Sequence, residues 1–125
     1  MSNLKELKSF IKEYERATNS HDFDQVKPLI AKDALYWFSE GTFKGIKAIE
    51  KIFVQTWNKV KEEKYHIKNV KWLMTDNKYG VCVYDFFWQG KVNEKLKQGH
   101  GRGTNFFVKK GKKWQIGHEH LSVVR

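Results

Sequence analysis

The stretch KWQIGHEHLSVV, residues 113–124, has the alternating pattern of a β-strand near the end of the chain. Successive side chains of a strand point to opposite faces of the sheet. One face carries Trp114, Ile116, His118, His120 and Ser122. The other face carries Gln115, Gly117, Glu119, Leu121 and Val123. Because Trp114 and Ile116 mark the first face as the interior, we expect His118 and His120 to point inward.

Upstream of this strand, the apolar pattern is helical at first and strand-like later. Helical spacing predicts helices at residues 3–19, 23–29 and 46–60, and strand formers fill residues 34–38 between the last two. Later strands are predicted at residues 65–75, 79–89, 103–109 and 113–124. Residues 40–45 are expected to be a turn-rich connection, and residues 90–102 a long polar one with a flexible glycine-rich end, Gly99–Gly103. This order predicts an α+β fold in which three N-terminal helices pack on a curved, mixed or antiparallel sheet and enclose a pocket.

The predicted strand at residues 79–89 is apolar on both faces. One face carries Cys82, Tyr84, Phe86 and Trp88. The other carries Val81, Val83, Asp85 and Phe87. A sheet that is apolar on both sides needs cover on its back, and the helices cover only one side. We therefore expect a homodimer through the sheet, with Asp85 at the interface or paired with a basic group; an exposed apolar patch is the alternative.

Composition indicates one ordinary globular domain spanning residues 1–125. The chain is 40% hydrophobic and 30% charged, and it contains nine Phe, five Tyr and five Trp. The first residues lack the apolar core of a signal peptide, and no stretch approaches the roughly 20 apolar residues of a membrane span. The single cysteine, Cys82, forms no internal disulfide and is expected to be a small buried residue. We expect a cytoplasmic protein with no membrane partner.

The net charge of +10 raises the question of nucleic acid. The lysines are spread along the chain, and the cluster at residues 109–113 is typical of a solvated turn. A hydrated surface is the preferred interpretation, attraction of an anionic substrate is a second one, and nucleic-acid binding is not expected.

Acid–base chemistry is the hypothesis that the inward histidines support. Imidazole takes and gives protons near neutral pH, so His118 or His120 is the candidate base. Tyr14 lies on the apolar face of the first helix and is the candidate hydrogen-bond donor to a developing oxyanion. Structural roles for all three are the alternative. A His-x-His pair is too few ligands for a metal site, and the glycine spacing fits no phosphate-binding loop, so neither metal nor cofactor is expected.

Several motifs together resemble the NTF2-like superfamily, which includes SnoaL-like polyketide cyclases, ketosteroid isomerases and scytalone dehydratase. They are YERATNSHDFD at residues 14–24, AKDA at 31–34, GIKAI at 45–49 and WQIGHEH at 114–120. The resemblance covers nearly the whole chain. It implies a cone of curved sheet and helices that commonly dimerises, with a pocket inside.

The resemblance to ketosteroid isomerases does not extend to the residue that acts as general base in that family. Tyr14 matches the oxyanion-hole tyrosine of that family, but Phe38 stands where the general-base aspartate is expected, and the second aspartate position falls near Thr104. A standard ketosteroid isomerase is therefore not expected. The closing motif instead resembles SnoaL-like members, whose corresponding strand lines the pocket.

These inferences together predict a protein that binds a small organic molecule. The predicted pocket residues, besides the candidate catalytic ones, are Trp37, Phe38, Phe53, Trp57, Tyr84, Phe86, Trp88, Thr104 and Phe106. An acid–base enzyme of the isomerase, dehydratase or cyclase type, acting on a hydrophobic or aromatic compound, is the first hypothesis. A non-catalytic ligand-binding or association module is the second, because one fold hosts many functions.

Overall fold

Three α-helices and six β-strands make up the part of the chain, residues 3–124, that this computed structural model describes. The helices are α1 (Asn3–Asn19), α2 (Phe23–Val26), which runs into a 3-10 turn (Lys27–Leu29), and α3 (Ile46–Lys59). The strands are β1 (Ile30–Phe38), β2 (Gly41–Lys44), β3 (Lys61–Thr75), β4 (Tyr79–Val92), β5 (Lys95–Lys110) and β6 (Lys113–Val123). No helix among these residues is long and apolar enough to cross a membrane.

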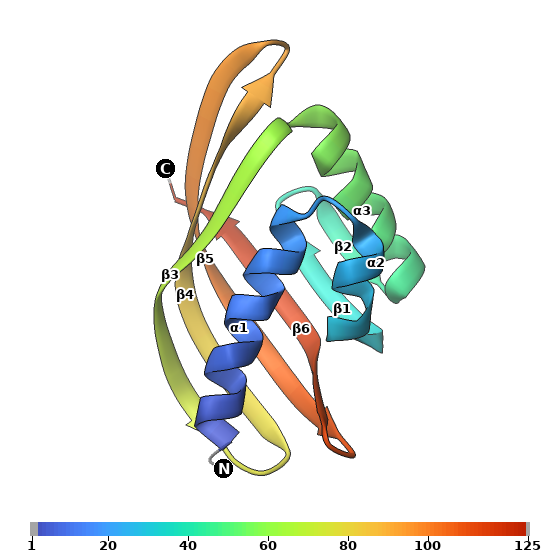
Figure 1. The fold of residues 1–125 in the computed structure, drawn as a ribbon, viewed down its shortest axis with the longest axis vertical. Helices are drawn as coiled ribbons and strands as arrows, with labels where there is room; N and C mark the ends of the chain where they lie inside the picture. Colours follow the sequence, from blue (N-terminus) through green and yellow to red (C-terminus); the bar gives the residue numbers. More distant parts are fainter. Residues whose placement is uncertain (1–2, 125) are drawn as a thin grey trace.

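The strands form one mixed sheet in the order β2-β1-β6-β5-β4-β3, with β1 and β6 parallel and the other neighbours antiparallel. All three helices lie on the same face of this sheet, with α1 running across it (Figure 1). The predicted α+β architecture, with helices on one face of a curved sheet, is confirmed. The opposite face is called the outer face below.

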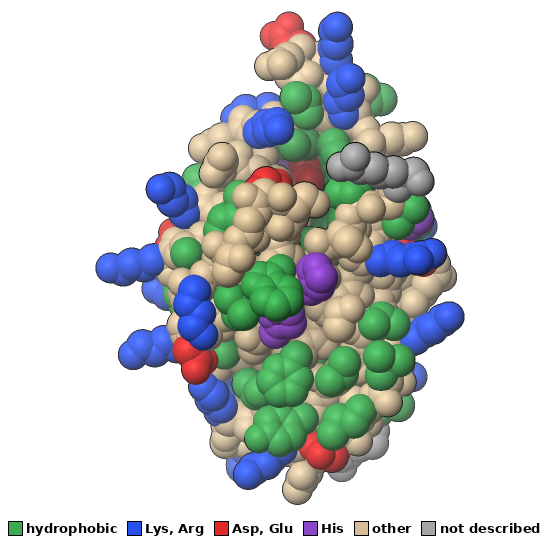
Figure 2. All heavy atoms as spheres, turned by 180° about the vertical axis from the view of Figure 1, so that it is seen from behind, with side chains coloured by type: hydrophobic (Ala, Val, Ile, Leu, Met, Phe, Trp, Pro, Cys, Tyr) green, Lys and Arg blue, Asp and Glu red, His purple; other side chains and the backbone are tan. Residues whose placement is uncertain are grey.

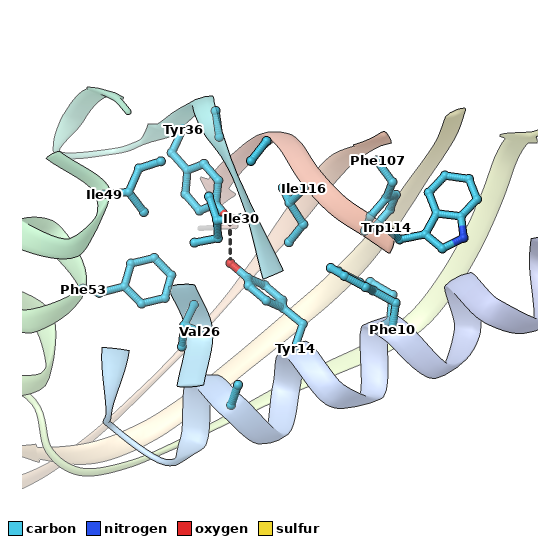
Figure 3. Close-up of a cluster of buried hydrophobic side chains, with 14 of the residues drawn as sticks. Phe10, Tyr14, Val26, Ile30, Tyr36, Ile49, Phe53, Phe107, Trp114 and Ile116 are labelled. Atoms are coloured by element: carbon cyan, nitrogen blue, oxygen red, sulfur yellow. Dashed lines mark hydrogen bonds between the residues drawn. The ribbon is translucent and has the colours of Figure 1, made fainter. Parts of the chain in front are cut away.

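The core forms where the apolar stripes of α1 and α3 meet the inner face of the sheet. From α1, the buried residues include Leu7, Phe10 and Tyr14, and Ile49 and Phe53 come from α3. They pack against strand residues such as Phe107 and Ile116 (Figure 3). Burying each large apolar side chain contributes about 1.5–3 kcal/mol relative to leaving it exposed, so the helical periodicity of the sequence explains why the helices dock here.

The free edge of β3 is held by the C-terminal half of α1. Asn19 accepts a hydrogen bond from the Tyr65 backbone N–H (2.7 Å) and donates one to the Tyr65 carbonyl (2.8 Å), and Glu15 accepts one from the Ile67 backbone N–H (2.7 Å). These bonds satisfy backbone groups that an edge strand otherwise leaves unpaired. They also fix Tyr65 beside the end of α1.

Two predicted connections are strands instead. Residues Gly41–Lys44 form β2, and the expected long polar connection after residue 89 is a continuous hairpin of β4 and β5. Its turn is Asn93-Glu94, both with positive φ (52° and 66°), the backbone of a two-residue hairpin turn. The hairpin projects beyond the helices at the top of Figure 1.

The alternate glycines of β5, which we expected to be flexible, lie inside the strand and face the rings of β4. Gly99, Gly101 and Gly103 pair with Trp88, Phe86 and Tyr84, respectively. A Cβ at any of the three positions would clash with the ring opposite. The glycines therefore let three large aromatic side chains of β4 lie flat over β5, on the inner face.

The predicted faces of β4 are confirmed: Cys82, Tyr84 and Phe86 are buried on the inner face. Burial raises the pKa of the Cys82 thiol to about 12, so this cysteine is an inert, protonated core residue. On the outer face, Asp85 has basic and polar partners, as one of the two predicted alternatives states. It accepts a hydrogen bond from Asn69 (2.8 Å) and lies 3.4 Å from the His100 ring nitrogen.

The predicted faces of β6 are correct only up to Ile116. Ile116 pairs with Phe107 and His118 pairs with Phe106, so Gly117 is an extra residue that forms a β-bulge. Beyond the bulge the alternation is inverted, and Glu119 is buried (2% exposed) while His120 is exposed. The prediction that His118 and His120 point inward is wrong, because the bulge inserts one residue into a pattern of period two.

Candidate functional site

A cavity of about 580 Å³ opens between α1, α3 and the inner face of the sheet. Most of its wall is apolar and aromatic. The rings and aliphatic side chains that line it are Tyr14, Phe38, Phe53, Trp57, Val60, Tyr65, Phe86, Trp88, Val92, Leu121 and Val123. Five predicted ligand-binding residues, Phe38, Phe53, Trp57, Phe86 and Trp88, thus lie together on the cavity wall. That they bind a ligand stays a prediction.

The other predicted pocket residues lie elsewhere. Tyr84 is buried (3% exposed) on the inner face but does not line the cavity. Thr104 pairs with His120, and Phe106 stacks on the exposed Tyr79 ring with centroids 5.7 Å apart, so both are on the outer face. Trp37 is also on that face and is 43% exposed.

His118 and His120 form an outer-face cluster with Trp37. The Trp37 ring lies 5.1 Å from the His118 ring and 5.5 Å from the His120 ring, edge-on to both. The His118 Nδ1 donates a 2.6 Å hydrogen bond to the Leu35 carbonyl. Neither histidine lines the cavity. Histidine side chains and large hydrophobic ones lie together on this face in Figure 2.

Glu119 is the ionisable group that the bulge turns inward, and it lies at the cavity wall among hydrogen-bonding side chains. Asn105 donates a 3.1 Å hydrogen bond to the Glu119 Oε1, and Tyr84 donates a 2.8 Å hydrogen bond to the Asn105 Oδ1. Asn105 is fully buried, so this chain fixes the orientation of its amide. Tyr14, which also lines the cavity, is bonded to Tyr36 through their hydroxyls (3.0 Å; Figure 3).

Burial raises the pKa of the Glu119 carboxyl to about 7, while the hydrogen bond from Asn105 and the nearby Tyr14 and Tyr84 hydroxyls act in the opposite direction. A carboxyl with this pKa exists in both protonation states near neutral pH, which suits a general acid or base. Burial also raises the pKa values of the Tyr14, Tyr36 and Tyr84 phenols well above their usual range. These phenols therefore stay protonated and can donate hydrogen bonds.

A second carboxyl, Glu63, lines the cavity and also owes its direction to a bulge. Lys61 pairs with Lys91 and Lys64 pairs with Gln89, so two residues of β3 lie opposite the single Gly90. Glu62, with a φ of 54°, points outward and pairs with Lys91 (3.0 Å), whereas Glu63 lines the cavity. Burial raises the pKa of Glu63 to about 7.

Three polar residues of the site, Glu119, Asn105 and Glu63, were not predicted from the sequence. A glycine inside a strand pattern is the one signal that was present for Glu119, because such glycines often mark bulges. Gly117 carries that signal in KWQIGHEH. Nothing comparable marks the bulge before Lys64, since the glycine that accommodates it, Gly90, lies on the neighbouring strand 26 residues further along the chain.

Comparison with solved structures shows the same fold in proteins that are named for different functions. An NTF2-like superfamily protein from Salmonella enterica superposes with a TM-score of 0.88 at 17% identity, covering 97% of this chain and 90% of that one. A putative scytalone dehydratase from Novosphingobium aromaticivorans gives 0.86 at 11% identity, covering 98% and 84%. The association domain of CaMKII from C. elegans gives 0.77 at 15% identity, covering 95% and 94%.

The sequence itself matches a family profile. The search of curated proteins found no match. The profile of the SnoaL-like domain matches residues 7–125, which include every residue of the cavity wall. The chain therefore belongs to the SnoaL-like domain family.

Proposed function

We propose that this protein binds a small, largely hydrophobic molecule in the cavity and performs acid–base chemistry on it with Glu119. One observation carries the proposal: a buried carboxyl with a pKa of about 7 lies at the wall of an aromatic cavity of about 580 Å³. A perturbed ionisable group in a largely apolar cavity is the combination that most favours a catalytic site.

The neighbours of Glu119 have complementary roles in this proposal. As a carboxylate, Glu119 takes a proton from a carbon or hydroxyl of the ligand, and as an acid it returns the proton elsewhere, as isomerisation, dehydration and cyclisation all require. Tyr14, which reaches the same cavity, donates a hydrogen bond to the oxygen on which negative charge develops. Asn105 and Tyr84 hold the Glu119 carboxyl in position.

Proton exchange tests this role without knowledge of the natural reaction. Hydrophobic ketones are first screened for thermal stabilisation of the protein, because a ligand of the folded state alone must stabilise it. Loss of the α-proton of a bound ketone into D₂O is then followed by NMR. We expect wild-type protein to accelerate the exchange, and Glu119→Gln to bind the ketone but slow the exchange about 100-fold or more. Equal exchange by both proteins, or no ketone that binds, contradicts the proposal.

We propose self-association through the outer face as a second function of the fold. Large apolar side chains are exposed there, including Trp37 (43%), Met74 (45%) and Tyr79 (42%). In Figure 2, hydrophobic side chains cover the middle and lower part of this face, while lysines and arginines lie mainly around its rim. The similar fold of the CaMKII association domain supports this proposal, and a second copy of the chain would cover the patch.

Sedimentation velocity tests the association. We expect a homodimer that Trp37→Glu converts to monomer, because the substitution places a charge in the middle of the apolar contact. Val54→Glu is the matched control, since Val54 is similarly exposed (40%) but lies on α3, on the other side of the sheet. A monomeric wild type, or a dimer that only Val54→Glu disrupts, contradicts this proposal.

A further inference from the structure

Glu63 is the one half-buried carboxyl of the cavity that lacks a partner. Within residues 3–124, no hydrogen bond or ion pair reaches its carboxylate, although its backbone carbonyl accepts a bond from His21 Nε2 (3.1 Å). Its neighbour in the bulge, Glu62, is exposed and paired with Lys91. An unpaired charge is costly to bury. A cationic group of a ligand would therefore be stabilised beside the Glu63 carboxylate, which has no partner in the cavity.

The space beside Glu63 is bounded by aromatic rings. Tyr65 lies two residues further along β3 and pairs with Trp88, and both rings line the cavity. Trp57 of α3 also lines the cavity, and His21 links it to Glu63: the His21 ring stacks on Trp57 with centroids 5.4 Å apart and donates a hydrogen bond to the Glu63 carbonyl. Ring faces attract cations, most strongly those of tryptophan.

Gly90 allows the bulge that carries Glu63 to lie close against β4. It lies opposite the bulge, and a Cβ there would come within 2.9 Å of the Lys61 carbonyl oxygen and 3.1 Å of the Glu63 Cα. A larger residue would therefore displace the bulge that directs Glu63 inward. The carboxylate, the rings and the glycine are thus parts of one arrangement.

The charges of the cavity also differ from those of the protein as a whole. The sequence has 24 Lys and Arg against 14 Asp and Glu, yet the charged residues lining the cavity are Glu40, Glu63 and Glu119 against Lys59 and Lys97. Both lysines are exposed and hydrated, whereas Glu63 and Glu119 are the sheltered groups. The interior therefore disfavours an anion despite the basic surface.

We propose that the cavity selects an organic monocation, with an ammonium group held by Glu63 and a hydrocarbon or aromatic body lying among Trp57, Tyr65 and Trp88. This inference rests on the proposed function of the cavity and specifies its ligand class. The ammonium supplies the missing partner of Glu63 through a charge-assisted hydrogen bond, and the rings add cation–π attraction. The rest of the ligand extends toward Glu119.

Three probes of the same shape separate charge from hydrophobicity. They are 4-phenylbutylamine, 4-phenylbutanol and 4-phenylbutanoate, which are a cation, a neutral molecule and an anion at pH 8. Their Kd values are measured by calorimetry with wild type, Glu63→Gln and Glu62→Gln. The last variant is the matched control, because it removes the adjacent carboxylate that points away from the cavity.

We expect wild type to bind the amine about tenfold or more tightly than the alcohol, and the anion most weakly. Glu63→Gln should lose the preference for the amine and keep the affinity for the alcohol, while Glu62→Gln behaves as wild type. In wild type the preference should also shrink from pH 8 to pH 6, because Glu63 and Glu119 both take up protons in this range. The other charged groups that line the cavity are Glu40, Lys59 and Lys97. This second measurement uses only wild-type protein, so it does not depend on whether the variants fold.

Other outcomes overturn the inference in distinguishable ways. If the alcohol or the anion binds as tightly as the amine, the cavity is a ligand site but cation selection is wrong. If Glu63→Gln keeps the preference, Glu63 is not the selecting group. If none of the three probes binds, the inference fails, and the ketone screen decides separately whether the cavity binds a ligand.

Discussion

Strands β4 and β6 are the two neighbours of β5. Inward and outward side chains alternate regularly along β4, whereas a bulge interrupts this alternation in β6. β4 pairs with β5 residue by residue from Tyr79 to Val92, and its inner rings lie over the glycines of β5. β6 pairs with the other edge of β5 and slips by one residue at Gly117, which moves Glu119 to the inner face. The regular pair builds the apolar wall, and the bulged pair supplies a carboxyl to it. A bulge is thus the means by which a polar group enters an otherwise apolar face.

The largest expected effect comes from breaking the regular pair. Gly101→Val should destabilise the protein by about 3 kcal/mol or more, because its side chain would clash with the Phe86 ring and the Ser122 carbonyl. Chemical denaturation measures the change. Gly117→Ala is the control at the bulge: its Cβ would lie 3.2 Å from Phe106, a contact that a small shift relieves, so the cost should stay near 1 kcal/mol. Equal costs would remove the distinction between the two pairs.

The carboxyl that the bulged pair turns inward should make the stability of the protein depend on pH. The folded state holds the Glu119 proton more tightly than the unfolded chain, since burial raises the pKa from 4.5 to about 7. The energetic cost of this carboxyl is therefore absent below pH 4.5 and grows as pH rises through 7. Glu119→Gln lacks this cost, so its stability relative to wild type should increase by about 2–3 kcal/mol between pH 4.5 and pH 8. Denaturation curves at several pH values that run parallel for the two proteins would contradict this.

A smaller effect is expected from the phenol beside the carboxyl. Tyr14→Phe removes the hydroxyl that bonds Tyr36 at 3.0 Å and that lowers the pKa of Glu119. We expect a loss of about 1 kcal/mol in stability and a further rise in the Glu119 pKa. Thermal denaturation and NMR titration measure the two changes. If the pKa of Glu119 stays the same or falls in this variant, the Tyr14 hydroxyl does not lower the pKa of Glu119.

The smallest effect is expected on the outer side of the bulge. His120→Ala should leave ligand binding in the cavity unchanged and alter monomer stability by about 0.5 kcal/mol or less, because this side chain is exposed on the outer face. Calorimetry with any cavity ligand measures the first quantity. Loss of ligand binding in this variant would indicate that His120 points into the cavity, as strict alternation predicts.

The fold could be predicted from sequence because its signals are local and repeated. The apolar stripes of α1 and α3 are long, and β4 alternates regularly, so the inner faces of these three elements and the order of the helices and long strands are correct. The turn at Asn93-Glu94 was missed because the polar residues around it resemble a loop, whereas pairing with β4 keeps them in a strand.

The candidate site was predicted less well because it depends on register. Phe38, Phe53, Trp57, Phe86 and Trp88 reach the cavity wall from elements whose faces were correct. Glu119 and Glu63 follow bulges, where one extra residue inverts every later side chain. Whether a glycine such as Gly117 is paired or bulged depends on its partner strand, and this information is not local in the sequence.

Carboxyl ¹³C NMR titration measures the pKa values of Glu119 and Glu63, on which the proposed acid–base site depends. We expect two glutamate carboxyls to titrate near pH 7, and we expect Glu119→Gln to remove one of these signals and Glu63→Gln to remove the other. The remaining glutamates provide internal reference signals. If every glutamate titrates near its ordinary value, or if the Glu119→Gln variant retains both signals near pH 7, the bulge at Gly117 does not bring an acid–base carboxyl into the cavity.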